Sequence, residues 1–226
     1  MSQEKRTIVI PSQLLGDVKN NKAGSGTFVE NGKIYSEVLG VLNKNKDFIN
    51  VTPIKGRYDP TPNDFVIGII QEAMQSAWLV DINAAYPALL HVNEVPWDVD
   101  FGETEKYLNH GDVIMAKVLS VDQEKKLNVT IKDRNLYKVK GGNIVDVEPT
   151  KVPRIIGKKG SMISLLKKYT NCRMFVGQNG RIWIDGEDEG VKKVISTIEM
   201  IQEESLSYGL TDKVEKLLKK DAKDVQ

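Results

Sequence analysis

Short apolar runs separated by turn-forming residues fill the first part of the chain. Four such runs, with Gly, Asn and Pro between them, cover residues 7–10, 26–29, 33–42 and 47–53. Runs of this length that are rich in β-branched and aromatic residues predict strands, and Asn31 followed by Gly32 predicts a hairpin turn. The Pro-containing stretch 59–62 interrupts the pattern. Residues 1–60 are therefore expected to form an N-terminal β domain, a small antiparallel sandwich or barrel.

The next part of the chain carries five further apolar runs that predict strands, at residues 65–71, 77–82, 88–91, 113–121 and 127–131. A long polar connection at 93–109 separates the third run from the fourth, and the polar stretch 122–126 joins the last two. Five short strands with one long connection are typical of an OB-type barrel. We expect this second domain to occupy residues 63–135.

The last third of the chain mixes helix and strand. Its pattern predicts a strand, two helices, two strands and a helix, at residues 143–148, 152–156, 161–169, 173–176, 181–184 and 187–207. An α+β domain is therefore expected over residues 143–207. A charged helical tail follows at 208–226, with a small apolar stripe of Val214, Leu217 and Leu218. The whole chain is predicted to be a multidomain protein, mainly β with one α+β domain.

Composition limits the class of protein. Of the 226 residues, 40% are hydrophobic and 28% are charged, as expected of a globular chain. A single cysteine, Cys172, excludes a disulfide framework and a cysteine-based zinc site, and it suits a reducing compartment. The sequence has no run of about 20 apolar residues that would cross a membrane, and no signal-peptide core. We therefore expect a cytoplasmic protein with no membrane partner.

The tetrapeptide Gly157-Lys158-Lys159-Gly160, between two predicted helices, has the clearest chemistry of any motif in the chain. Glycines at both ends let the backbone approach a phosphate without a Cβ atom in the way, and the two lysines add positive charge. The helix that follows turns its unpaired amides and the positive end of its dipole toward the same place. The loop is therefore a candidate phosphate-binding site.

The charge around this loop differs from that of the whole chain. The chain has 32 basic and 31 acidic residues, but residues 149–184 contain no Asp or Glu. The basic residues in that stretch are Lys151, Arg154, Lys158, Lys159, Lys167, Lys168, Arg173 and Arg181. A clustered basic face in a neutral protein is typical of a site for a polyanion, although a solvated helix face would also carry lysines.

The order of elements in residues 143–207, with a GxxG loop between the first two helices, resembles that of type I KH RNA-binding domains. In that family the loop holds the sugar-phosphate backbone of about four nucleotides. The resemblance implies RNA contacts from Arg154, Gly157, Lys158, Lys159 and Gly160.

Residues 63–135 resemble the S1 RNA-binding family, most specifically in GDVIMAKVLSVDQEKKLNVTIKD and also in DFVIGII and ALLHVNEV. That family stacks unpaired bases on aromatic side chains of the second and third strands, beside basic residues. The resemblance implies RNA contacts from Trp78, His91, Asp122 and Lys126. It also places Gln75 where the family has another aromatic residue, so one stacking surface is expected to be missing. The sequence leaves open whether Trp78 and His91 face RNA or the core.

A β-rich N-terminal domain, an S1 domain and one KH domain together span the whole chain. With the turn Gly-Gln-Asn-Gly at 177–180 followed by Arg-Ile-Trp-Ile, the chain resembles the KH-containing RNA-binding cap subunits of the RNA exosome, most like the archaeal form. In that family three cap subunits sit on a hexameric ring of RNase PH-like proteins. The resemblance implies a non-catalytic subunit that binds single-stranded RNA, docks on the ring through residues 1–60 and guides the RNA 3′ end to the phosphorolytic sites.

Two other classes of function are open from the sequence. A hydrolase or nuclease would need catalytic groups, but His91, His110 and the single cysteine have no triad-like spacing. The acidic run 185–189 would suit a divalent metal, but it also suits the first turn of a helix. A free-standing S1/KH regulator of transcription or translation would need a docking partner for the N-terminal domain. We expect no catalytic residue, no metal ligand and no cofactor.

Overall fold

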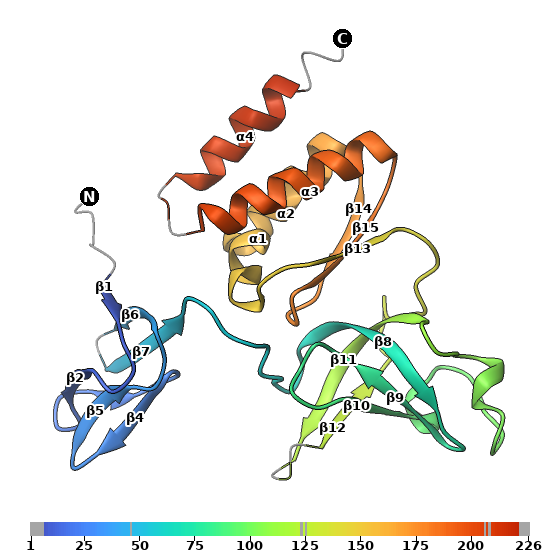
Figure 1. Ribbon diagram of the computed structural model, residues 1–226, viewed down its shortest axis with the longest axis horizontal. Helices are drawn as coiled ribbons and strands as arrows, with labels where there is room; N and C mark the ends of the chain where they lie inside the picture. The colour runs from blue at the N-terminus through green and yellow to red at the C-terminus, as the bar shows by residue number, and fades with distance from the viewer. Residues whose placement is uncertain are drawn as a thin grey trace. The chain divides into compact units, whose positions relative to one another are not determined.

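Figure 1 shows the computed structural model of the chain, which describes residues 7–45, 47–122, 124, 126–205, 207 and 209–221. The chain divides into two compact units, Met1–Gly56 and Arg57–Gln226. The first unit has one core, and the second has two, one for each of its domains.

The first unit consists of seven short strands in two sheets, which confirms the predicted small β domain. One sheet has the order β1-β6-β7-β3 and the other β2-β5-β4. Both sheets contribute to one core of Val9, Leu15, Ile34, Ile49 and Val51. The strands are β1 (Thr7–Val9), β2 (Leu14–Asp17), β3 (Lys22–Ala23), β4 (Thr27–Glu30), β5 (Lys33–Ser36), β6 (Gly40–Lys44) and β7 (Phe48–Pro53).

The turn between β4 and β5 is the predicted hairpin. Asn31 has φ 48° and Gly32 has φ 74°. A two-residue type I′ turn needs positive φ at both central residues, and Asn-Gly supplies it with little strain. The strands pair on either side of the turn, with Glu30 opposite Lys33.

The structure differs from the predicted strands of this unit in two ways. The run 33–42 is two strands, because the chain bends after Ser36: Glu37 N donates to Gly26 O at 3.0 Å, and Ser36 Oγ donates to Val38 O at 2.7 Å. Strands β2 and β3 have no counterpart in the prediction, since four and two residues are too few for a visible alternation.

The second unit begins with a closed five-stranded barrel, as predicted. The strand order around the barrel is β10-β12-β11-β8-β9. Apolar side chains such as Ile70, Leu90, Ile114 and Val129 fill its interior and have no exposed surface. The strands are β8 (Phe65–Ala73), β9 (Ala77–Asp81), β10 (Ala88–His91), β11 (Val113–Val121) and β12 (Leu127–Thr130), with short 3₁₀ helices at Val92–Glu94 and Thr104–Lys106.

An α+β domain follows, with the element order and sheet topology of a type I KH domain. Its antiparallel sheet has the order β13-β15-β14, and helices α1, α2 and α3 pack against one face of that sheet (Figure 1). The elements are β13 (Asn143–Asp146), α1 (Val152–Ile156), α2 (Ser161–Thr170), β14 (Arg173–Val176), β15 (Arg181–Asp185) and α3 (Asp188–Glu203), with 3₁₀ turns at Pro149–Lys151 and Lys158–Gly160.

The helical tail extends this domain. Helix α4 (Leu210–Asp221) contacts α2, and its residues Leu210, Val214 and Leu218 are buried in the core of the domain. Leu217, which the sequence places in the apolar stripe, is instead 40% exposed. The stripe therefore follows an i, i+4, i+8 spacing, which is the face that a straight helix presents to one neighbour.

Buried polar contacts from the β14–β15 turn join the barrel to the KH domain. Asn179 is fully buried, and its Nδ2 donates to Ile67 O at 2.8 Å and to Ile82 O at 2.9 Å. Its Oδ1 accepts from Ile67 N at 3.3 Å. Arg181 Nη2 donates to Asp81 Oδ2 at 2.5 Å. These contacts explain why the two domains form one compact unit.

The ion pair between Asp81 and Arg181 gives Arg181 a structural role. Burial alone would raise the pKa of Asp81, but hydrogen bonds from Arg181 and the Asn83 amide and the charge of Arg181 hold that pKa below its usual value. Arg181 also lies 3.5 Å from Asp146 and is only 7% exposed. Its inclusion in the predicted basic face is therefore wrong, because its charge is used inside the protein.

Candidate nucleic-acid interface

The GKKG loop is a tight turn whose backbone requires glycine at its first position. Gly157 has φ 74° and ψ 171°. A Cβ atom there would lie 2.7 Å from Met162 N and 2.8 Å from Met162 Cβ, so a side chain would clash with the start of α2. Gly160 has φ 77°, but a Cβ atom there would lie 3.9 Å from its nearest neighbour, Ile163. Only the conformation, and not the space, favours glycine at this second position.

The two lysines are placed outward by this turn. Lys158 and Lys159 are both exposed, and Lys159 has φ 55°, in the left-handed region. Helix α2 starts directly after the loop with Gly160 as its N-cap, and no side chain caps its first amides. An anion held there would meet two ammonium groups and the positive end of a ten-residue helix. This arrangement suits a phosphate group.

An apolar groove with a volume of about 330 Å³ lies beside the loop. Its lining comes from the 3₁₀ turn, α1, the loop and the β14–β15 turn, through Pro149, Val152, Pro153, Ile156, Gly157 and Gln178. A groove of this kind next to a phosphate site can hold unpaired bases while the backbone lies on the loop. Gln178 was not predicted as a site residue; its position is fixed by a hydrogen bond from its backbone N to Phe65 O of 2.8 Å.

The eight basic residues of the predicted face do not lie together in the structure. Arg154, in the last turn of α1, is half-buried near the loop with Lys158 and Lys159. Lys167 and Lys168 lie at the opposite end of α2, roughly 10 Å away by helix rise. Lys151 pairs with Ser205, Arg173 with Asp185, and Arg181 with Asp81.

Trp78 is not available for stacking, which corrects its prediction as an RNA-binding residue. The side chain has no exposed surface and lies in the barrel core, and its Nε1 donates to Leu108 O at 3.0 Å. The outward positions of β9 are Leu79 and Asp81, which are partly exposed. Because Gln75 also departs from the aromatic pattern, this strand offers no aromatic face to a base.

The other predicted barrel residues are at the surface and already have polar contacts. His91 is partly exposed, and its Nδ1 accepts from Asn93 N at 3.1 Å. Asp122 Oδ1 accepts from Lys126 N at 2.7 Å, and Lys126 Nζ lies 2.6 Å from Glu124. Since β10 and β12 run parallel with Ala88 opposite Leu127, His91 lies roughly 13 Å along the strands from Lys126. The structure therefore does not bring these residues into one compact site.

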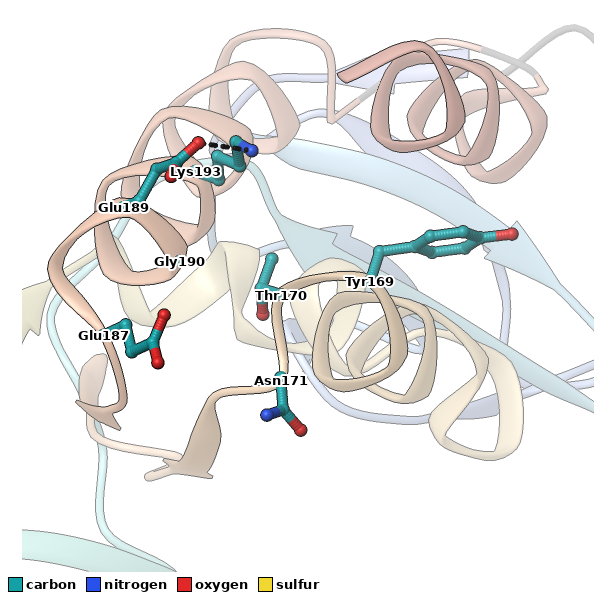
Figure 2. A pocket seen from close by; sticks show the side chains of 7 residues that line it. All are labelled: Tyr169, Thr170, Asn171, Glu187, Glu189, Gly190 and Lys193. Carbon is teal, nitrogen blue, oxygen red and sulfur yellow. Dashed lines mark ion pairs between the residues drawn. The ribbon is translucent and has the colours of Figure 1, made fainter. Parts of the chain in front are cut away.

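Figure 2 shows a second pocket, between the end of α2 and the start of α3, with a volume of about 160 Å³. Glu189 and Lys193 form an ion pair of 3.0 Å on its wall (Figure 2). Asp188 and Glu189 occupy the first turn of α3, where carboxylates favour the helix dipole. Within the described part of the chain, no group of three His, Cys, Asp or Glu side chains could hold a metal ion. Asp185 ends β15 and pairs with Arg173, and Glu187 is the N-cap of α3.

The fold and the loop define a class: a protein that joins an OB-type barrel to a type I KH domain with a GxxG turn. Residues 6–55 match the family described as "Exosome RNA binding protein RRP4 N-terminal domain", and residues 142–190 match the KH domain family. The chain is 47% identical over 215 residues to the exosome complex component Rrp4 of Methanosarcina mazei, covering 95% of this chain and 82% of that protein. The chain belongs to the Rrp4 family of exosome components.

Further relatives agree with this assignment. The Rrp4 protein of Picrophilus torridus is 44% identical over 217 residues, which are 96% of this chain and 94% of that protein. A crystal structure of a protein assigned to the exosome complex as an RNA-binding component has a TM-score of 0.68 at 33% identity, and covers 76% of this chain and 100% of its own. None of the helices in the described residues is long and apolar enough to cross a membrane.

Proposed function

We propose that this protein is a non-catalytic RNA-binding cap subunit of an exosome, and that its KH domain captures single-stranded RNA. The observation that carries the proposal is the GKKG turn, which places Lys158 and Lys159 in solvent beside an apolar groove. Phosphates would bind the lysines and the first turn of α2, and unpaired bases would enter the groove. Contacts of this kind position RNA and read little sequence.

The proposal includes docking on a hexameric ring of RNase PH-like subunits, with three copies of this chain per ring and the RNA 3′ end guided inward. The surface of the first unit supports docking on a protein. Among its described residues, eight large apolar side chains are exposed, whereas only five are buried in the core. Ile10 is 61% exposed and Ile8 is 55% exposed. Exposed apolar surface on this scale is typical of a protein-protein interface. A cytoplasmic location fits the unpaired, buried Cys172.

The first prediction concerns the loop. Replacing both lysines, Lys158→Asp and Lys159→Asp, should weaken binding of a fluorescently labelled single-stranded RNA at least tenfold, because two phosphate contacts become repulsive. The slope of log K against log salt should also fall by about 0.7 for each lost contact. Fluorescence anisotropy titrations at several salt concentrations measure both effects.

The matched control is the same charge change at the other end of α2, Lys167→Asp and Lys168→Asp. If both double variants bind RNA equally weakly, the effect is one of general charge. The loop would then not be the RNA-binding site. Unchanged melting temperatures would show that both variants fold, as expected for exposed positions.

The second prediction concerns the ring. Ile10→Asp should prevent assembly with purified RNase PH-like subunits, because a charge at an apolar contact must be desolvated without a partner. Multi-angle light scattering would report the mass of the complex, and hence the number of cap copies. Leu217→Asp, at an exposed apolar position of the second unit, is the control. Failure of the unsubstituted protein to join the ring would favour a free-standing S1/KH regulator of transcription or translation.

A further inference from the structure

One aromatic side chain of the barrel projects into solvent to an unusual degree. Phe101, in the connection between β10 and β11, is 77% exposed, the largest value for any large hydrophobic residue in the described part of the chain. Met74, in the neighbouring β8–β9 turn, is 38% exposed. The RNA-binding site proposed above uses neither residue.

Hydrogen bonds fix the backbone on which Phe101 stands. Gly102 N donates to Gln75 O at 2.9 Å, and Gly102 has φ 81° with nothing near a Cβ position. Thr104 is 2% exposed, and its Oγ1 donates to Met74 O at 2.6 Å. The segment that carries Phe101 is therefore tied to the β8–β9 turn by two bonds from the residues that follow it.

A second set of contacts supports the preceding part of the connection. The rings of Trp97 and Tyr107 stack with their centroids 5.7 Å apart and an angle of 8° between their planes. Tyr107 OH donates to Asp98 O at 2.8 Å. An aromatic side chain on such a support loses little conformational entropy on binding, which is the property of a preorganised anchor.

The charge around Phe101 decides which kind of partner it fits. Residues 93–106 contain a single basic residue, Lys106, which pairs with Glu103 at 2.5 Å. The carboxylates of the same stretch are Glu94, Asp98, Asp100, Glu103 and Glu105. A nucleic acid that stacked a base on Phe101 would bring its phosphates close to these groups, and like charges repel. A protein surface rich in Lys and Arg would be attracted.

We propose that Phe101 and the acidic residues beside it form a docking element for a partner protein. The partner's surface would present an apolar pocket for the phenyl ring, rimmed by lysine and arginine side chains. Buried aromatic anchors surrounded by complementary charge carry most of the binding energy in many interfaces. This role is separate from the RNA site at the GKKG loop, and it does not depend on it.

The test places a photo-crosslinking group at the tip of the loop. Phe101→p-benzoylphenylalanine in the full chain, expressed in its native cells and irradiated, should crosslink to a protein, and the adduct peptide should contain Lys or Arg beside apolar residues. Tyr86→p-benzoylphenylalanine is the control, since Tyr86 is 54% exposed at the opposite end of β9. That position should not give the same adduct.

Binding of the purified partner provides the second readout. Phe101→Ala should weaken binding at least tenfold without changing the melting temperature. The pair Asp98→Asn and Asp100→Asn should lower the association rate several-fold and reduce its dependence on salt. RNA affinity should be the same in all these variants as in the unsubstituted protein.

Three results would overturn the proposal. An adduct to RNA at position 101, together with weaker RNA binding by Phe101→Ala, would make the side chain a base-stacking group. An adduct that appears equally from position 86, or none at all, would leave Phe101 without a partner. A partner peptide that is acidic would contradict the charge argument.

Discussion

At the scale of single residues, the shape of the GKKG turn depends on Gly157 more than on Gly160. Both have positive φ, but only at Gly157 would a Cβ atom meet the backbone of α2, 2.7 Å from Met162 N. Gly157→Ala should therefore destabilise the protein by about 2–4 kcal/mol, from the strain of a φ/ψ pair that only glycine adopts readily and from the clash together. RNA affinity should also fall, because the lysines would move. Chemical denaturation and RNA titration measure the two effects.

Gly160→Ala is the matched control, with φ 77° and open space around the Cβ position. This substitution should lower the free energy of unfolding by only about 1 kcal/mol, the usual strain of an alanine in the left-handed region. Equal losses of stability in the two variants would mean that α2 shifts to accept the alanine side chain at position 157. The clash would then not be what requires glycine there.

The turn between α1 and α2 could be predicted from the sequence because a GxxG segment between two helices is a local pattern, and its role in RNA binding stays a prediction. The orientation of Trp78 could not, because the run from Ala77 to Val80 is apolar throughout and alternation carries no signal there. In the barrel Trp78 shares a face with Val80 and Ile82, and all three are fully buried. The burial of Arg181 could not be predicted either, because its partner Asp81 lies 100 residues away in the chain.

At the scale of secondary-structure elements, α4 is part of the KH core. Leu218 is 3% exposed in that core, whereas Leu217, the preceding residue, is 40% exposed. Leu218→Ala should reduce the free energy of unfolding by about 2–5 kcal/mol, the range for large-to-small changes in a core. Leu217→Ala should change it by less than about 1 kcal/mol, since the side chain keeps much of its contact with water. Urea denaturation of both variants measures the difference.

This pair of variants separates packing from helix propensity, because both remove a leucine from the same helix. Similar losses would indicate that α4 is held by its own helical stability and not by α2. The sequence predicts the helix but not its buried face: Val214, Leu217 and Leu218 form one apolar group, and the position of α2 decides which of them is covered. Strands β2 and β3 have no counterpart in the prediction because such short segments show no visible alternation.

At the scale of the whole molecule, the barrel and the KH domain are held together by hydrogen bonds from two buried polar side chains, Asn179 and Arg181. Asn179, in the β14–β15 turn, and Arg181, the first residue of β15, make six hydrogen bonds to the backbone and side chain of the barrel at Ile67, Asp81 and Ile82, within 2.5–3.4 Å. A junction of this kind fixes the GKKG loop relative to the barrel. It also couples the stability of the junction to pH.

The sign of that coupling follows from Asp81, whose pKa is lowered in the folded protein because the bonds from Arg181 and Asn83 and the charge of Arg181 outweigh burial. A lowered pKa means that the ion pair stabilises the fold above the unfolded value, about 4, and that the contribution is lost as pH falls through the folded value. The difference in melting temperature between the unsubstituted protein and Asp81→Asn should therefore be constant from pH 7 to pH 5 and should shrink below pH 4. Glu124→Gln, in an exposed pair with Lys126, should differ little from the unsubstituted protein at any pH. If the Asp81→Asn difference persists unchanged at pH 3, the ion pair is not what couples the junction to pH.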